Sequence, residues 1–297
     1  MAHAVVIINP LSGRGRQPSN VDAQAALARA VLAAHGFEAR IRPTTKSGDA
    51  RAYARDAVDA HCDLVVVWGG DGTVNEAASA LVHTPVPLAI VPSGSGNGLA
   101  ADLGVAFNAH GALTLAATGR TLAIDAGTVD DHFFFNIAGI GVDAVIAAQF
   151  AKRPKHRRGF VGYLQLSSAE LMRYRCQTYT LTTDDGIVEH RAMLIALANG
   201  RQYGNRLLIA PGARLDDGQL EIVVVEELSL LGIAWRLPSL FRGTLRPGRG
   251  VSMRAASKLR IASAAPIPYH VDGEPRLGGQ TLVVSTHPRA LHVRAPL

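Results

Sequence analysis

Glycines, an aspartate and a threonine stand together as Gly69-Gly70-Asp71-Gly72-Thr73, and residues of these types could hold a phosphate group. The apolar residues 64–68 before them are typical of a buried strand, and residues 74–82 after them have helical spacing. Glycine lets a backbone approach a phosphate closely, and the first N–H groups of a helix attract an anion. Because Asp71 would repel phosphate, we interpret it as a metal ligand, direct or through water, or as a group that acts on a hydroxyl. A tight turn with a solvated aspartate is the alternative, which five specified residues in this context disfavour.

The helix after this turn carries a start signal of its own. Thr73-Val74-Asn75-Glu76 is the sequence of a capping box, in which Thr73 and Glu76 satisfy each other's backbone N–H groups. This pattern predicts a helix over residues 74–82 that begins directly after Thr73.

A second glycine-rich turn, Pro92-Ser93-Gly94-Ser95-Gly96-Asn97-Gly98, follows the next apolar strand at residues 87–91 and opens a helix. The carboxyl ends of parallel strands share one edge of a sheet, so we expect the two turns to line one crevice. There Ser95 and Asn97 could donate to phosphate oxygens or to a ribose. A flexible loop is the alternative for this turn taken alone.

The loop after the first strand, Asn9-Pro10-Leu11-Ser12-Gly13-Arg14-Gly15, is expected at the same edge. Ser12, Gly13 and Arg14 could contact phosphates, although arginine loops are commonly just solvated. The chain has no G-x-x-x-x-G-K-[ST] run, and Gly13-Arg14-Gly15 lacks the third glycine of a dinucleotide-binding fingerprint. The P-loop and classical dinucleotide sites are therefore excluded.

Acidic residues form turns in the second half of the chain. Asp272-Gly273-Glu274 lies between two strand-like stretches, and Asp-Gly favours a hairpin turn on local grounds. Asp216-Asp217-Gly218 has the same pattern, with a hard-cation site as the less favoured alternative. Asp125 and Asp143 flank an apolar segment, and either could be structural.

The order of elements predicts two domains. Strands are expected at residues 5–9, 37–42, 64–68 and 87–91, and helices at 21–35, 49–60 and 74–82. Buried strands separated by helices favour a parallel sheet covered by helices on both faces. From residue 132 onward strands dominate, at 133–137, 177–183, 193–198, 219–225, 258–262, 280–285 and 290–294, with helices only at 160–174 and 228–241. This second pattern predicts a β-sandwich.

Composition agrees with a globular two-domain protein of 297 residues, 48% of them hydrophobic. No apolar run reaches the roughly 18 residues that a membrane-spanning helix needs, and the first residues resemble a strand, not a signal peptide. The two cysteines, Cys62 and Cys176, suggest neither a disulfide framework nor a zinc site. A net charge of +6 favours an anionic partner such as a nucleotide, a nucleic acid or a membrane, unless it reflects only a basic proteome.

Residues 65–81, with their Gly-Gly-Asp-Gly-Thr core, resemble the nucleotide motif of the diacylglycerol kinase catalytic family, which includes bacterial lipid kinases, sphingosine kinases and ceramide kinases. NAD kinases and phosphofructokinases share the core, whereas the Asn75-Glu76 that follows is similar to the lipid-kinase branch. The resemblance covers most of the chain. Its further carriers are Asn9-Pro10, Ser12-Gly13, Phe135 to Asp143, Asn199-Gly200 through Gly204, Ala210-Pro211, Asp217-Gly218 and Asp272-Gly273-Glu274.

The resemblance implies an ATP- and Mg²⁺-dependent lipid kinase. Its α/β Rossmann-like domain would comprise residues 1–125, with 280–297 returning to it, and its β-sandwich lipid-substrate domain residues 126–279. Glu274 would be the catalytic base with Asp272 close by, and Asp71 would join a magnesium and water network. A second, structural magnesium would use Asp217 and carbonyls around Arg214 and Gln219. The residues expected to bind ATP are Asn9, Ser12, Gly13, Thr44, Gly69, Gly70, Asp71, Gly72, Thr73, Asn75, Gly94, Ser95 and Asn97.

The chain departs from the family pattern in the second turn. Many bacterial diacylglycerol-type members have an aspartate where this chain has Gly98, and Pro-x-Gly-Ser-Gly-Asn is closer to sphingosine and ceramide kinases. The departure leaves the acceptor lipid open, whether diacylglycerol, a sphingoid base, ceramide or another lipid, and removes one candidate ligand of the magnesium network.

A lipid acceptor would bring the protein to a membrane. The dense cationic stretch from Lys152 to Arg158 precedes apolar residues and suits an anionic bilayer, with a solvated loop as an equal alternative. Residues 228–241, with Trp235 and Phe241, are a second candidate, for which a packed helix is the favoured interpretation. We expect a cytoplasmic protein peripheral to the inner face of the membrane, and these folds often form homodimers.

The sequence disfavours three other functions. An NAD kinase would use the same core motif on a soluble acceptor, but Asn75-Glu76 and the second turn disfavour it. A non-catalytic nucleotide- or lipid-binding relative is disfavoured by the joint presence of Asp71, Asp217, Asp272 and Glu274. Nucleic-acid binding is not expected, because neither an aromatic platform nor a recognised DNA-binding motif is present.

Overall fold

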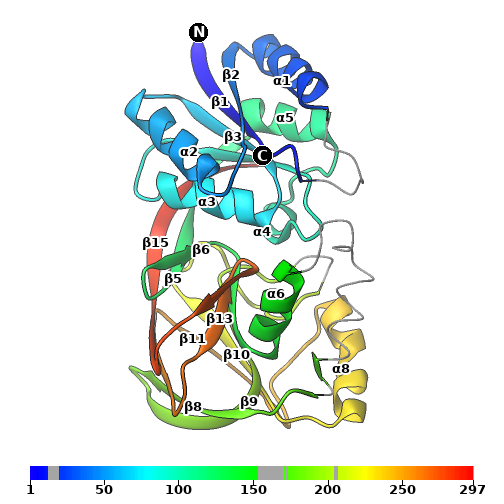
Figure 1. The fold of residues 1–297 in the computed structure, drawn as a ribbon, viewed down its shortest axis with the longest axis vertical. Coiled ribbons are helices and arrows are strands. Elements are labelled where there is room, and N and C mark those ends of the chain that lie inside the picture. The colour runs from blue at the N-terminus through cyan, green and yellow to red at the C-terminus, as the bar shows by residue number, and fades with distance from the viewer. Residues whose placement is uncertain (13–19, 153–169, 172, 204–206, 297) are drawn as a thin grey trace. The chain divides into compact units, whose positions relative to one another are not determined.

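The structure is a computed structural model that describes residues 1–12, 20–152, 170–171, 173–203 and 207–296. The chain divides into two compact units, and each is described by itself (Figure 1). Unit 1 comprises Met1–Ile124 and Arg289–Leu297, and unit 2 comprises Asp125–Pro288. The strands β5 (Arg120–Val129) and β15 (Thr281–Ala295) each contribute residues to both units.

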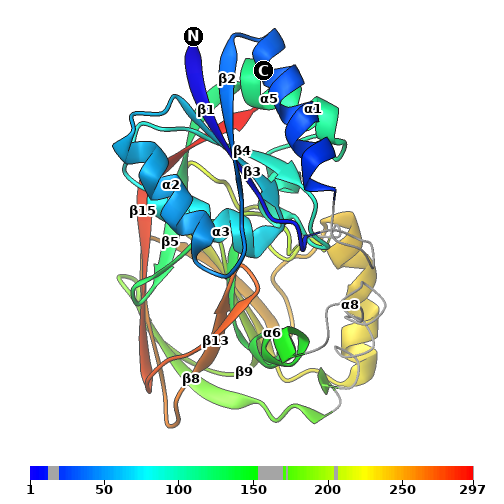
Figure 2. The same ribbon diagram turned by 45° about the horizontal axis from the view of Figure 1, so that its top comes forward.

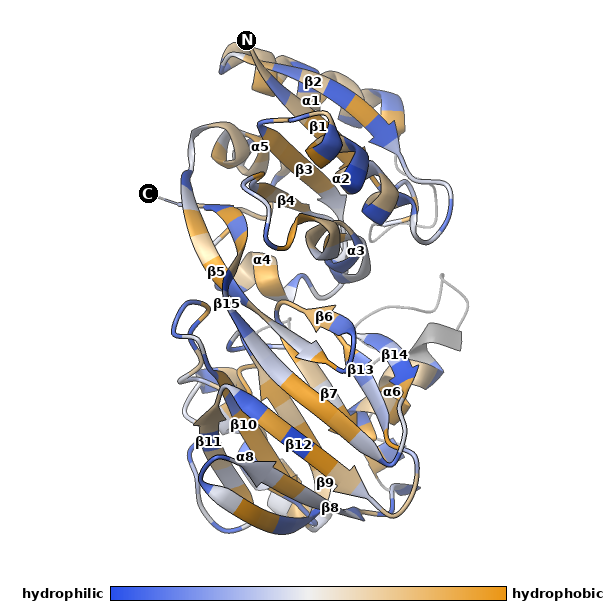
Figure 3. Cartoon of the chain, turned by 90° about the vertical axis from the view of Figure 1, so that its left-hand side faces the viewer, coloured by the Kyte–Doolittle hydropathy of each residue, from blue (hydrophilic) through white to orange (hydrophobic). Residues whose placement is uncertain are grey.

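Unit 1 is built on a parallel sheet in the order β2-β1-β3-β4, as the alternation of strands and helices predicts. The strands are β1 (Ala2–Ile8), β2 (Phe37–Pro43), β3 (Leu64–Gly69) and β4 (Leu88–Pro92). Every residue of β3 is buried, because this strand lies between β1 and β4, and Figure 3 shows it in the hydrophobic colour. The last part of β15 extends the sheet beyond β4, with Val293 paired in parallel to Leu88.

Helices connect the strands of unit 1. They are α1 (Val21–Ala34), α2 (Asp49–Asp59), α3 (Asp71–Leu81), α4 (Gly98–Asp102) and α5 (Ala109–Thr118). Contacts join α1 to α5 and α2 to α3, and Figures 1 and 2 show these two pairs. Register aligns the strand ends, with Ile8 opposite Trp68 and Gly69 opposite Pro92, so the turns after β1, β3 and β4 leave the sheet at one edge.

Unit 2 is the expected antiparallel β-structure. Its strands are β6 (His132–Phe134), β7 (Ile137–Gly141), β8 (Gln177–Thr183), β9 (Gly186–Ala198), β10 (Leu220–Glu226), β11 (Val251–Ala256), β12 (Lys258–Ser263), β13 (Pro268–Val271) and β14 (Glu274–Leu277). The long strand β9 pairs with β7, β8 and β10, and β12 joins β8 to β15. Two helices of this unit are α6 (Val142–Lys152) and α8 (Leu230–Arg242).

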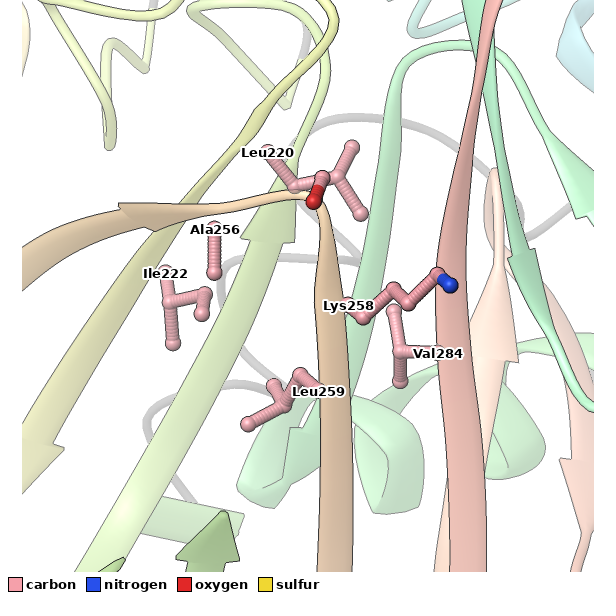
Figure 4. A pocket seen from close by; sticks show the side chains of 7 residues that line it. Leu220, Ile222, Ala256, Lys258, Leu259 and Val284 are labelled. Atoms are coloured by element: carbon pink, nitrogen blue, oxygen red, sulfur yellow. The ribbon is translucent and has the colours of Figure 1, made fainter. Parts of the chain in front are cut away.

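Side chains that alternate along these strands form two cores. Ile195 and Leu197 of β9 belong to one cluster, and their neighbours Ala196 and Ala198 belong to another on the opposite face. Along β12, buried Leu259 and Ile261 alternate with exposed Lys258 and Arg260, and Figure 3 shows this pattern as bands of colour. Figure 4 shows a recess between β10 and β12, whose apolar lining consists of core positions. We therefore treat this recess as packing and not as a ligand site.

Several expected elements are corrected. The single strand expected at residues 133–137 is two, β6 and β7, which are separated at Phe135 and Asn136. The two strands expected at 280–285 and 290–294 are the one strand β15. Helices α5 and α6 and strands β5, β11, β13 and β14 were not expected, and most of the helix expected at 160–174 lies outside the described residues.

Candidate active site

The turns after three strands of unit 1 are joined by hydrogen bonds. The side-chain amide of Asn9, after β1, donates to Thr73 Oγ1 of α3 at 2.8 Å. The hydroxyls of Ser12 and Ser93 lie 2.7 Å apart, which links the first loop to the turn after β4. These contacts collect three loops, distant in sequence, at the carboxyl edge of the sheet, where open α/β folds bind ligands.

The two glycine turns touch each other backbone to backbone. A Cβ atom placed on Gly94 would lie 2.7 Å from Gly70 Cα, and one on Gly70 would lie 3.1 Å from Gly94 Cα. Real Cβ atoms essentially never come as close as the first of these distances, so glycine is required for the approach. The two turns, which were expected to line one crevice, therefore lie against each other.

Asp71 joins the same two turns. Its Oδ2 accepts the backbone N–H of Asn97 at 2.8 Å, and its Oδ1 accepts that of Gly98 at 2.9 Å. Asn97 has a positive φ of 54° and is buried, and its side-chain amide bonds to both backbone groups of Gly94. The carboxylate of Asp71 is therefore bonded within the site and not simply solvated. The side-chain amide of Asn97 holds the shape of the second glycine turn.

The predicted capping box is wrong. Helix α3 begins at Asp71, three residues earlier than expected, and its N-cap residue is Gly70, which has no side chain to cap the helix. The two residues of the predicted box bind elsewhere: Thr73 Oγ1 accepts from Asn9, and Glu76 accepts from Ser47 Oγ and Gly48 N, each at 2.9 Å. The start of α3 is thus left without a side-chain cap, which suits the N-terminus of a helix that binds an anion.

Thr44 lies at the same edge, directly after β2. Its backbone N–H donates to the carbonyl of Ile8 at 2.8 Å. The residues that follow are held by Asp49, whose Oδ2 accepts Thr45 N at 2.7 Å, Thr45 Oγ1 at 2.8 Å and Lys46 N at 3.0 Å. The backbone N–H of Thr45, then its hydroxyl and the N–H of Lys46, lower the pKa of Asp49.

The structure brings most of the expected nucleotide residues together. Those in the loops and turns at this edge, or at the start of α3, are Asn9, Ser12, Thr44, Gly69, Gly70, Asp71, Gly72, Thr73, Gly94, Ser95 and Asn97. Asn75 lies further into α3 with its side chain buried, and Ser95 is exposed. Gly13 lies outside the described residues.

In unit 2, Asp272 and Gly273 form the two-residue turn between β13 and β14, and both have positive φ, 47° and 86°. The hairpin expected from Asp-Gly is therefore present. The carboxylate of Asp272 also accepts backbone N–H groups from Phe135 at 2.9 Å, Asn136 at 3.0 Å and Ile137 at 3.1 Å. These bonds hold the interruption between β6 and β7, which explains why one strand was expected and two are observed.

Glu274 begins β14 with its side chain exposed. Three backbone donors already occupy the neighbouring carboxylate of Asp272, whereas that of Glu274 faces solvent. A general base must be able to reach the proton that it removes. Of the two, Glu274 is the better placed for that task, and Asp272 fixes the backbone around it.

A buried polar network, which was not predicted from the sequence, lies behind this hairpin. Asp143 Oδ2 accepts from Tyr203 Oη at 2.7 Å and lies 3.1 Å from His270 Nε2. The backbone N–H of Gly273 donates to His270 Nδ1 at 3.2 Å, so the ring proton lies on Nε2 and points at Asp143. A Cβ atom on Gly139 would lie 2.0 Å from Asp143 Oδ2, so only glycine leaves room for the network.

The turn from Arg214 to Gln219, expected to hold a structural metal, is held by hydrogen bonds within it and to a neighbouring strand. Asp217 Oδ1 accepts Gln219 N at 3.1 Å, and Gly218 N donates to the buried Asp125 Oδ2 at 2.6 Å. Across the described residues, no group of three His, Cys, Asp or Glu side chains could hold a metal ion. A cation here would depend on one carboxylate and on backbone oxygens.

The expected membrane segment from Lys152 to Arg158 lies outside the described residues beyond Lys152, the last residue of α6. No helix among the residues that the structure describes is long and apolar enough to cross a bilayer.

Two family profiles match the chain. Residues 3–129 match the diacylglycerol kinase catalytic domain, and residues 136–295 match the YegS C-terminal NAD kinase beta sandwich-like domain. Together they account for both the α/β architecture of unit 1 and the β-sandwich of unit 2.

Curated relatives match over most or all of their length. A probable lipid kinase YegS-like protein of Pectobacterium atrosepticum is 31% identical over 268 residues, which cover 88% of this chain and 87% of that protein. One from Yersinia enterocolitica is 29% identical over 303 residues, covering 100% and 98%. A crystal structure of a diacylglycerol kinase from Bacillus anthracis superposes with a TM-score of 0.76 at 21% identity, covering 99% of this chain and 96% of that one, and shows the same fold.

Both halves of the chain thus carry the signature of one family, and membership of a kinase family implies a nucleotide donor and a divalent metal. The chain belongs to the diacylglycerol kinase catalytic-domain family, among the YegS-like probable lipid kinases.

Proposed function

We propose that this protein transfers the γ-phosphoryl group of ATP, with Mg²⁺, to the hydroxyl of a lipid. The observation that carries the proposal is the contact of Gly70 with Gly94, bridged by Asp71. At this contact neither glycine has a side chain that would cover its backbone, and the contact lies beside the start of α3, which has no side-chain cap. Such a place suits the phosphate groups of a nucleotide.

The residues at this edge fit a magnesium–nucleotide complex. Mg²⁺ is commonly held by one or two carboxylates together with substrate phosphates and water, and Asp71 offers one carboxylate beside the turns. When bound, the ion would offset the negative charge that phosphoryl transfer spreads over the phosphate oxygens. Asp71 itself orients the second turn through Asn97 and Gly98, so the role we assign it includes shaping the phosphate site.

Glu274 is assigned the proton of the acceptor. Its exposed carboxylate would accept the proton of the lipid hydroxyl while the hydroxyl oxygen bonds to the γ-phosphorus and the bond from that phosphorus to ADP breaks. Asp272 holds the hairpin through the N–H groups of Phe135, Asn136 and Ile137 and positions Glu274 indirectly. A second Mg²⁺ at Asp217, with carbonyls around Arg214 and Gln219, is assigned a structural role.

The lipid nature of the acceptor is supported by the relatives, which are described as probable lipid kinases. Diacylglycerol and a sphingoid-type lipid are the two acceptors that the motifs favour. Phosphoryl transfer would take place at the cytoplasmic face of a membrane, where ATP is available. The two alternatives are transfer to a soluble acceptor such as NAD and nucleotide binding without transfer. An experiment must distinguish both from lipid phosphorylation.

The test is transfer from radiolabelled ATP with Mg²⁺ to a panel of lipids in mixed micelles, with NAD as a soluble acceptor. Wild type is compared with Glu274→Ala and with Glu38→Ala, an exposed carboxylate on β2. We expect a labelled lipid that disappears only with Glu274→Ala. Labelled NADP without a labelled lipid would contradict the proposal, as would ATP binding without transfer to any acceptor.

A further inference from the structure

Helix α8 is anchored in unit 2 by one side only. Ser229 caps its start by accepting Gly232 N at 3.2 Å, and Gly243 ends it with a positive φ of 64°. Ile233 packs against the cluster of Val142, and Leu240 against a second core cluster. The rotation of the helix about its axis is therefore fixed, and in Figures 1 and 2 it lies at the margin of this unit.

The opposite side of α8 presents large apolar side chains to solvent. Leu231 is 83% exposed, Trp235 82%, Phe241 50% and Leu237 42%. Ten large hydrophobic side chains are exposed among the described residues, and these four stand on one helix of 13 residues. Leu231 and Trp235 form one row of four-residue spacing, and Leu237 and Phe241 form another. The exposed residues Ala234 and Pro238 lie between the two rows, and an apolar patch of this kind marks an interaction surface. The sequence favoured a packed helix, and α8 is packed on one side only.

The charge around this outer face has one sign. Residues 228–250 contain four arginines and no acidic residue. Arg236 is used internally, because its guanidinium donates to the carbonyls of Gly232 and Arg249. The side chains of Arg242, at the end of α8, and of Arg246 and Arg249, in the residues that follow it, are exposed. Such a combination selects a partner that is both apolar and anionic.

We propose that the outer face of α8, formed by Leu231, Trp235, Leu237 and Phe241, docks on the surface of an anionic lipid bilayer. At about 1.5 Å per residue, α8 is far too short to span a bilayer and would lie in the plane of the interface. Tryptophan is enriched at that depth, and arginines there face anionic headgroups. A second copy of the chain fits less well, because pairing these faces would bring like-charged arginines together.

The inference rests on the proposed function for its purpose, since docking would hold the enzyme where a lipid acceptor resides. Docking predicts one result that the transfer reaction alone does not predict. Variants of the outer face should lose activity on lipids in vesicles while keeping it on a short-chain acceptor dispersed in water.

Binding is measured by co-sedimentation with vesicles of phosphatidylcholine, alone or mixed with phosphatidylglycerol. For the double variant Leu231→Ser/Trp235→Ser we expect affinity for the mixed vesicles to fall at least about tenfold, as loss of buried apolar side chains implies. Ile187→Ser, at a 70% exposed hydrophobic residue on β9, is the matched control and should bind as wild type does. Arg246→Glu should also weaken binding about tenfold, and Arg40→Glu on β2 should not.

Fluorescence gives a direct readout, because the chain has two tryptophans and Trp68 is buried. Mixed vesicles should shift the emission of Trp235 to the blue, and brominated lipids should quench it, while Trp235→Phe abolishes both effects. Equal binding by wild type and the double variant would overturn the inference, as would an absence of vesicle binding or a wild-type dimer that the variant dissociates. If docking fails but transfer to the short-chain acceptor persists, the proposed function survives. If docking holds but no lipid is phosphorylated, the proposed function falls instead.

Discussion

The carboxylate of Asp71 accepts the backbone N–H of Gly98 at 2.9 Å. The first residue of α3 is thus bonded to the first residue of α4 and holds the turn before α4. Asp71 belongs to the crossover after β3, and Gly98 to the crossover after β4. The two glycine turns thus form one structure that neither strand could build alone. Any change to the carboxylate should act on both turns together.

Asp71→Asn tests this coupling. An asparagine keeps one acceptor oxygen and turns an NH₂ group toward a second N–H, so one of the two bonds to Asn97 and Gly98 is lost. We expect about 1–3 kcal/mol less free energy of unfolding, measured in urea. Phosphoryl transfer should fall by about 100-fold or more, as for loss of a preorganised electrostatic group.

The matched control is Asp22→Asn, which changes an exposed carboxylate in the first turn of α1. It should leave transfer unchanged. Retention of wild-type transfer by Asp71→Asn would contradict the role assigned to the carboxylate.

Gly94→Ala should abolish nucleotide binding. The new Cβ would lie 2.7 Å from Gly70 Cα, and because the opposing atom is backbone, the turns must separate. Gly212→Ala adds the same methyl group where no atom lies within 4 Å, and it should be neutral. Calorimetric titration with ATP distinguishes the two variants. Undiminished ATP affinity in Gly94→Ala would show that the close approach is not part of the nucleotide site.

The sequence correctly predicted those features that depend on residues close together in the chain. The parallel sheet followed from apolar strands between helices, and the hairpin at Asp272 and Gly273 followed from a dipeptide that tolerates positive φ. The failures concern partners that are distant in the chain. Thr73 bonds to Asn9, 64 residues away, which a capping-box pattern cannot register.

The same reason explains the interrupted strand and the missed network. Residues 133–137 have strand-like types, but Asp272, up to 137 residues later, takes the N–H groups that a continuous ladder would use. His270 and Asp143 are 127 residues apart. The only sequence signal for their contact was the glycine at Gly139, whose missing Cβ creates the space. A single sequence shows such a glycine without showing what fills the space.

His270→Ala tests whether this network positions the hairpin of Glu274. The variant removes the acceptor of Gly273 N and one partner of the buried carboxylate of Asp143. We expect kcat to fall while KM for ATP stays constant, because the residues proposed to bind the nucleotide lie in unit 1. Tyr203→Phe removes one hydrogen bond to the same carboxylate and should cost about 0.5–1.5 kcal/mol of unfolding free energy.

A structural role alone would give a different pattern from a positioning role. If His270→Ala lowers stability but leaves kcat at the temperature of full folding unchanged, the network does not position Glu274. A raised KM for ATP would point to a disturbance of unit 1 instead.

Asp49 should make the stability of the chain depend on pH. The backbone N–H of Thr45, its hydroxyl and the N–H of Lys46 lower the pKa of Asp49 in the folded state below the ordinary value of about 3.9. A lowered folded pKa means that the native state favours the charged form. The stabilisation is fully present above the ordinary pKa and is lost as the pH falls through the folded pKa.

Asp49→Asn, which cannot ionise, should therefore be less stable than wild type at pH 7, and the difference should narrow once the pH falls below about 4. Urea unfolding of both proteins along a pH series measures it. Asp59→Asn, on the exposed side of the same helix, serves as control and should show a smaller difference throughout. Because Asp49 holds the residues after Thr44, the variant should also raise KM for ATP. A difference in stability that does not change with pH would show that Asp49 acts through shape and not through charge.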